Sequence, residues 1–62
     1  MARTDASKLE MIAFIVDIQV RNNEDDDGDK YLSSADYAME AIEAVLDDRD
    51  SSILRQFLDS AS

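Results

Sequence analysis

The hydrophobic positions of this chain recur at the spacing of α-helices in three segments, the first of which covers about residues 4–20. This first segment carries two adjacent apolar stripes, so a helix there would be apolar around most of its circumference. One stripe contains Leu9, Ile12, Val16 and Val20, and the other contains Met11, Phe14 (or Ile15) and Ile18.

The start of this first helix carries an N-terminal signal. Ser7 and Glu10 have the spacing of a capping box, which favours a helix start between Thr4 and Ser7. The alternation of β-branched and polar residues around Val16 and Ile18 would also suit a strand. Because no partner strand is evident, we predict a helix.

Two further helices follow an acidic, turn-prone loop over residues 21–30. The second begins at Ser33 or Ser34, whose hydroxyls are typical N-caps, and the third runs from about Ser51 to Ser60. The predicted buried face of the second is Ala35, Ala38, Met39, Ile42, Val45 and Leu46, and that of the third is Ile53, Leu54, Phe57 and Leu58.

These elements predict one all-α domain over residues 1–62, a small bundle of three helices. A chain of this length buries only about 60% of its unfolded surface, so a second source of stability is expected. The first helix would keep apolar surface for a dimer or an obligate partner, through Met11, Phe14, Ile15 and Ile18. The alternative is a monomer in which the third helix closes over that surface.

The net charge of −9 is concentrated in the last forty residues, where residues 23–62 hold twelve acidic and three basic side chains. Such a field repels nucleic acid and anionic membranes, and it attracts cations or basic proteins. The acidity would equally suit a salt-rich habitat, where it would serve solubility alone. Acidic Asp5 and Glu10 near the start and the short apolar run over residues 11–16 favour a cytoplasmic protein.

The residue types needed for most catalysis are missing. The chain has no histidine and no cysteine, so a serine nucleophile would lack its usual base, and one glycine is too few for a phosphate-binding loop. We therefore predict a protein that is not an enzyme, with no catalytic residue and no cofactor.

The loop beginning at Asp25 suggests one exception, because its oxygen-bearing residues alternate as hard cations require. It resembles the calcium-binding loop of the EF-hand family, and the resemblance implies a calcium or magnesium site. Lys30 stands where the family has glycine, and Asp36 stands where it has a bidentate glutamate. The alternative is a solvated acidic loop. The implied ligands are Asp25, Asp27, Asp29, Tyr31 (through its carbonyl), Ser33 and Asp36.

A row of carboxylates on the second helix indicates a different function. Asp36, Glu40, Glu43 and Asp47 recur at helical spacing without lysines to offset them, which costs a few tenths of a kcal/mol per like-charged pair. Together with the loop, this row could occupy a basic groove built for nucleic acid. The residues expected to bind such a partner are Glu24, Asp25, Asp26, Asp27, Asp29, Asp36, Glu40, Glu43 and Asp47.

In size, charge and lack of catalytic groups, the chain is similar to the small phage-encoded inhibitors that mimic nucleic acid, anti-CRISPR proteins among them. The likeness is one of general character and implies a basic, nucleic-acid-binding protein as partner. A third possibility is a small dimeric adaptor or antitoxin-like protein, which would act through the apolar face of the first helix. In that case Phe14 and Ile18 would matter more than the acids.

Overall fold

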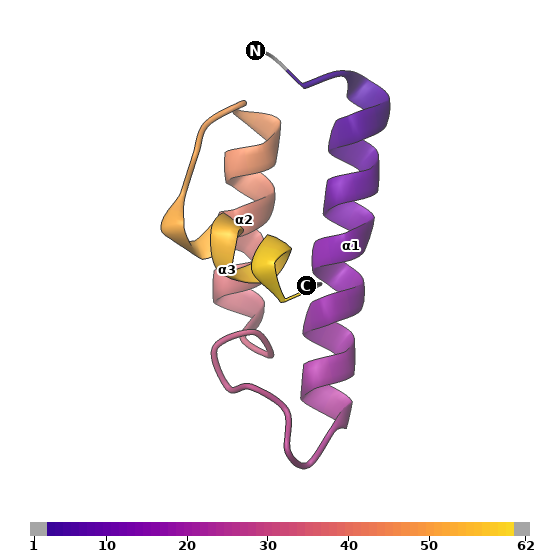
Figure 1. Cartoon of the computed structure of the whole chain (residues 1–62), viewed down its shortest axis with the longest axis vertical. Helices are drawn as coiled ribbons and strands as arrows, with labels where there is room; N and C mark the ends of the chain where they lie inside the picture. Colours follow the sequence, from indigo (N-terminus) through magenta and orange to yellow (C-terminus); the bar gives the residue numbers. More distant parts are fainter. Residues whose placement is uncertain (1–2, 61–62) are drawn as a thin grey trace.

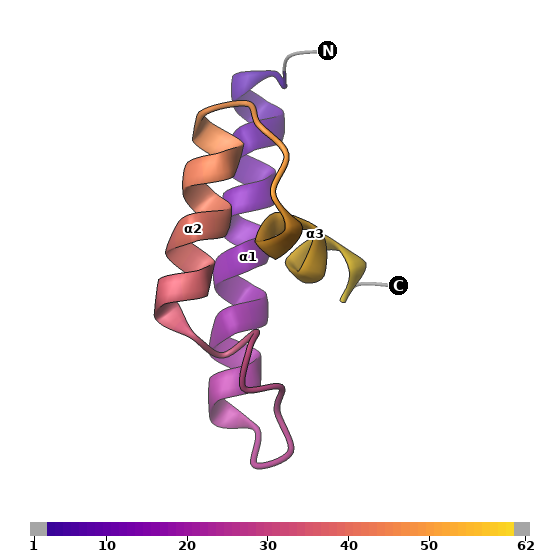
Figure 2. The same ribbon diagram turned by 90° about the vertical axis from the view of Figure 1, so that its left-hand side faces the viewer.

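The computed structural model describes residues 3–60 and contains three α-helices, with no strand in this part of the chain. They are α1 (Asp5–Glu24), α2 (Ala35–Leu46) and α3 (Ser52–Asp59). The long α1 and α2 run antiparallel, side by side, and the short α3 lies across one side of the pair (Figure 1). Figure 2 shows that the opposite side of the pair carries no helix. The prediction of an all-α bundle is confirmed.

Helix α1 begins within the predicted range and ends later than its apolar pattern predicts. Its N-cap is Thr4, whose hydroxyl accepts a hydrogen bond from the Ser7 N–H at 3.1 Å, so Ser7 lies inside the first turn and is not the cap. Its last turn extends to Glu24, into the segment predicted as loop. The alternative of a strand is wrong. Within residues 3–60, no helix has the length and apolar character needed to cross a membrane.

Gly28 allows the loop to fold back onto the end of α1. A Cβ atom at this position would lie 2.0 Å from the Asn22 carbonyl oxygen, so any other residue would collide with the helix. The side-chain oxygen of Asn22 also accepts a hydrogen bond from the Asp29 N–H at 2.9 Å. The φ angle of Gly28 is not positive, and the residue of 3–60 with a positive φ is Asp48, at 56°. Glycine is required here by close contact.

The core lies where all three helices meet, and α2 contributes mostly small side chains to it. Because the alanine side chains of α2 are small, the bulky Phe57 side chain of α3 can be buried against this helix. The face predicted for α2 is therefore partly wrong, because Met39 and Leu46 are exposed while Ala41 and Ala44 are fully buried. The buried residues are Ile15, Ala38, Ala41, Ala44, Val45, Leu54 and Phe57.

The caps of the two shorter helices agree with the sequence pattern. Ser34 caps α2, as one of the two predicted candidates, and its hydroxyl accepts from the Tyr37 N–H. Ser51 caps α3 by accepting from the N–H groups of Ile53 and Leu54 at 3.1 and 3.2 Å. These caps place the first carboxylate of α2, Asp36, in its first turn, where the helix dipole favours negative charge.

Candidate functional site

The acidic ridge of α2, which we define as Asp36, Glu40, Glu43 and Asp47, lies along the solvent side of the helix. All four residues are exposed, while the alanines that alternate with them are buried against the other helices. Only Asp47 among them forms an ion pair with a described basic residue, Arg49, at 3.5 Å. Among residues 3–60, the carboxylates of Asp36, Glu40 and Glu43 have no cationic partner.

The loop carboxylates extend this negative surface beyond the start of α2. Glu24, at the end of α1, and Asp25, Asp26, Asp27 and Asp29 are all exposed. Two of them also shape the loop. The Asp25 carboxylate accepts from the Asp27 N–H at 3.1 Å, and the Asp29 carboxylate accepts from the N–H groups of Tyr31 and Leu32 at 2.8 and 3.3 Å. The nine residues predicted to bind a partner are thus all accessible to one.

The residues of the EF-hand-like pattern are not brought together. No group of three or more acidic side chains within residues 3–60 is arranged to hold a metal ion. The carboxylates of Asp25 and Asp29 point to main-chain N–H groups, and the Ser33 hydroxyl donates to the Lys30 carbonyl at 3.1 Å. Asp36 lies within α2. The segment forms local turns and a helix N-cap, and its oxygens do not converge on one point.

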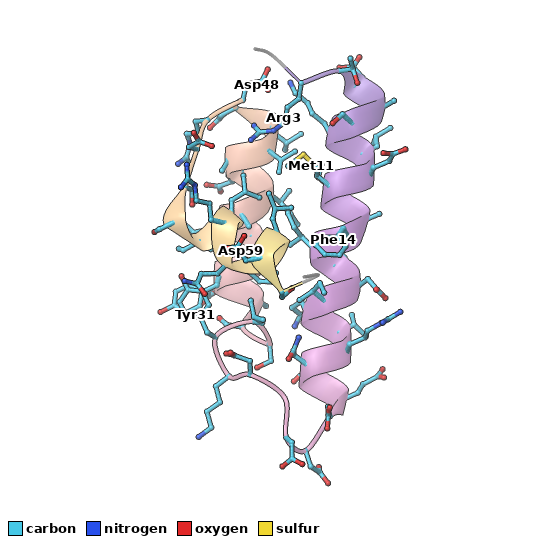
Figure 3. The ribbon with its side chains drawn as sticks, viewed as in Figure 1. Arg3, Met11, Phe14, Tyr31, Asp48 and Asp59 are labelled. Carbon is cyan, nitrogen blue, oxygen red and sulfur yellow. The ribbon has the colours of Figure 1, made fainter. Side chains whose placement is uncertain are left out.

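The basic side chains near the start of the chain are engaged at the opposite end of the molecule from the loop. Arg3 and Lys8 both pair with Asp48, just beyond the end of α2, at 3.6 and 3.5 Å (Figure 3). The Arg3 main-chain N–H donates to Asp48 at 2.9 Å, and together with the Lys8 ammonium it lowers the pKa of this carboxyl. These two positive charges are thereby held at the end of the molecule opposite the loop.

The side chains of two tyrosines near the start of α2 were not predicted to interact, since Tyr31 was expected to contribute only its carbonyl. The rings of Tyr31 and Tyr37 stack with centroids 4.3 Å apart and planes inclined by 30°. Tyr37 is 40% exposed and directly follows Asp36. The available signal was that the only tyrosines of the chain lie on either side of the Ser34 cap. An accessible aromatic face next to a carboxylate attracts a guanidinium group through both charge and ring quadrupole.

The residues predicted for self-association lie mostly inside the protein. Ile15 is fully buried, and Met11 and Ile18 pack against the core. Phe14 is half-buried on the side of α1 that faces the other helices (Figure 3). Helix α3 covers this side, as the monomer alternative predicted, so Ile15 cannot form a surface for a second chain. The exposed large apolar residues of α1 are instead Leu9, Val16 and Val20.

No family model, no curated protein and no solved structure matches this chain. The likeness to small acidic inhibitors therefore rests on size, charge and the missing catalytic groups. What the protein binds has to be inferred from its own surface.

Proposed function

We propose that this protein is a non-enzymatic inhibitor whose acidic surface occupies a basic, nucleic-acid-binding groove on a protein partner. The observation that carries the proposal is the acidic ridge of α2. Its carboxylates are exposed, and those of Asp36, Glu40 and Glu43 have no cation beside them among residues 3–60. The ridge thus holds negative charge that the described chain does not use for its own ion pairs.

A rigid helix presents this charge at a low entropic cost. The ridge covers about three helical turns, about 16 Å along the axis, with the Cβ atoms of neighbouring members about 5–6 Å apart. Like charges at this spacing repel and destabilise the free helix by a few tenths of a kcal/mol per pair. Lysine and arginine side chains from a phosphate-binding groove would relieve that repulsion on binding, as counterions do on a nucleic acid.

The tyrosine stack adds a contact suited to arginine. A guanidinium group could lie over the part of the Tyr37 ring that Tyr31 leaves exposed, which a compact ammonium group does less well. Proteins that bind nucleic acid are rich in such side chains. The partner is therefore expected to be an arginine-bearing basic protein, bound rapidly and with an affinity that falls as salt is raised.

The test is reversal of charge at the centre of the ridge. Glu40→Lys with Glu43→Lys changes the net charge from −9 to −5, since each reversal adds two positive units. Basic proteins captured from a cell extract on the immobilised wild-type chain are assayed for binding to a labelled DNA or RNA duplex, with the free chain added as competitor. We expect the wild type to displace the duplex and the double variant to do so roughly tenfold less well or worse.

A matched control separates position from total charge. Glu10→Lys with Asp50→Lys makes the same change in net charge at exposed positions outside the ridge. This control should still compete nearly as well as the wild type, and circular dichroism should show equal helix content in all three proteins. Equal competition by the wild type and the ridge variant would refute the proposal, as would a wild type that displaces no duplex from any captured protein.

A further inference from the structure

The side of the hairpin opposite α3 exposes large apolar side chains from both long helices. Leu9, Val16 and Val20 of α1 are 69%, 46% and 41% exposed, and Met39 and Leu46 of α2 are 60% and 56% exposed. Isolated apolar residues are ordinary on protein surfaces, but a continuous patch marks a contact site. Whether these residues form one patch depends on how the two helices are aligned.

The alignment places these residues on one side. Leu9, Ile12 and Leu46 line a single shallow depression between the start of α1 and the end of α2. One heptad further along each antiparallel helix, Val16 follows Leu9 and Met39 precedes Leu46, so each lies on the same side of its helix as the residue that lines the depression. Figure 2 shows α3 on the other side of the pair, which leaves this side uncovered.

Both helices carry their apolar positions at the same spacing. On each helix the steps are four, three and four residues, the spacing of a coiled-coil seam. Two such antiparallel seams side by side form half of a four-helix bundle. We name the eight positions the open face: Leu9, Ala13, Val16 and Val20 of α1, and Ala35, Met39, Ile42 and Leu46 of α2.

The eight residues of the open face are uncharged, although the chain carries a net charge of −9, and the charged Asp5 and Lys8 lie beside Leu9 at one end of it. The acids of α1 point elsewhere, as Glu10 and Asp17 do, and those of α2 form the acidic ridge. Asp5 reaches only the edge of the face, in the depression beside Leu9. The face can therefore be buried without removing a ridge carboxylate from water, which would be costly. A basic partner would find no carboxylate among the eight residues of this face to pair with.

The side of the molecule that contains the open face is large enough for a dimer interface. The Cα trace measures 37 × 20 × 19 Å, so one long side is comparable to the roughly 800 Å² per partner that a standard specific interface covers. The accessible surface of the chain is 4372 Å², above the roughly 4000 Å² expected for a monomer of 6.9 kDa. Covering a long side would remove that excess.

We propose that the open face binds the open face of a second copy of this chain, giving an antiparallel four-helix core. The seam is matched by an identical seam, which is what an isologous two-fold contact requires. In this dimer α3 and the acidic ridge lie outside, so the two acidic chains meet through their uncharged sides. The dimer does not depend on the inhibitor function, and each can fail without the other.

The test is the mass of the full chain in solution. Sedimentation equilibrium across about a hundredfold range of concentration should show a species of twice 6.9 kDa that dissociates on dilution. Val16→Glu with Met39→Glu should give the monomer mass with helix content retained, since both side chains are exposed in the single chain. As a control of equal charge, Ser52→Glu with Gln56→Glu on exposed positions of α3 should leave the dimer intact.

Salt distinguishes this contact from binding to a basic partner. Raising the salt should strengthen the dimer, because it screens repulsion between acidic chains, whereas it should weaken binding through the acidic ridge. If the Val16/Met39 variant unfolds, the wild type decides: its melting temperature should rise with concentration for a dimer. A wild type that is monomeric at all concentrations, or a dimer that survives Val16→Glu with Met39→Glu, would overturn the proposal.

Discussion

The two long sides of the α1–α2 hairpin are both apolar, yet only one is covered. On one side, Met11, Ile15 and Ile18 are packed beneath α3. On the other, Leu9 and Val16 are exposed. The difference arises because the short connection after α2 delivers α3 to a single side, where Leu54 and Phe57 fill the space over the alanines. The hydrophobicity of a helix stripe thus indicates that the stripe needs a contact. It does not indicate whether the same chain supplies that contact.

The largest expected effect on stability comes from shortening two adjacent side chains of α1, one on each side, and it tests directly whether the two sides differ. Ile15→Ala should lower the free energy of unfolding by about 2–5 kcal/mol, because Ile15 is fully buried among three helices. Val16→Ala should lower it by less than about 1 kcal/mol, because this side chain is 46% exposed. Urea denaturation of dilute protein, where any dimer has dissociated, measures both. Equal losses would mean that the two sides are equally covered.

A smaller loss of stability is expected at the closed end of the hairpin, where the loop fixes how α1 and α2 are oriented relative to each other. Gly28→Ala places a methyl group against the Asn22 carbonyl, so the loop must shift, at a cost of about 1–3 kcal/mol. Asp26→Ala is the matched control, since this exposed residue of the same loop should change stability by less than about 0.5 kcal/mol. Thermal unfolding of both variants measures the difference. A Gly28 variant as stable as the control would show that the loop adjusts without disturbing the helices.

The smallest effect is expected at the open end, where Asp48 joins the end of α2 to Arg3 and Lys8. The Arg3 N–H hydrogen bond and the Lys8 charge hold the pKa of Asp48 below its usual value, so the contact stabilises the fold above about pH 3.9. The stabilisation is lost as the pH falls through the lower pKa of the folded state. Asp48→Asn should therefore flatten the dependence of melting temperature on pH in this acidic range.

Asparagine suits this test because it tolerates the positive φ of Asp48. Asp50→Asn is the control, since it removes the same charge from a nearby exposed residue that pairs with neither Arg3 nor Lys8. Its pH profile should match that of the wild type. If Asp48→Asn left the wild-type profile unchanged as well, the ion pairs at this end would contribute nothing to folding.

Local signals in the sequence predicted the helices and the exposed acids well. Apolar spacing located all three helices, the serine hydroxyls marked the starts of α2 and α3, and the ridge carboxylates lie on the solvent side as their spacing indicated. These features depend on residues within a turn or two of each other. The last turn of α1 was missed because its residues are polar and carry no apolar spacing.

The features that the sequence did not reveal all depend on residues far apart in the chain. The position of α3 decides which of the two apolar stripes of α1 becomes part of the core. The packing of Phe57 against the alanines decides which face of α2 is buried. The need for glycine at position 28 comes from the carbonyl of Asn22. The tyrosine stack forms only once the loop has turned into α2.

The sequence by itself determined that this protein is a small set of amphipathic helices with a surplus of negative charge, because helix periodicity and ionisation are local properties. The tertiary structure alone decided which surfaces remain for partners. By placing α3 on one side and gathering Arg3 and Lys8 at Asp48, it leaves two different surfaces exposed: an acidic ridge without cations beside Asp36, Glu40 and Glu43 within residues 3–60, and an uncharged open face. The physical reason is that a chain this short can bury only one side of its longest helix.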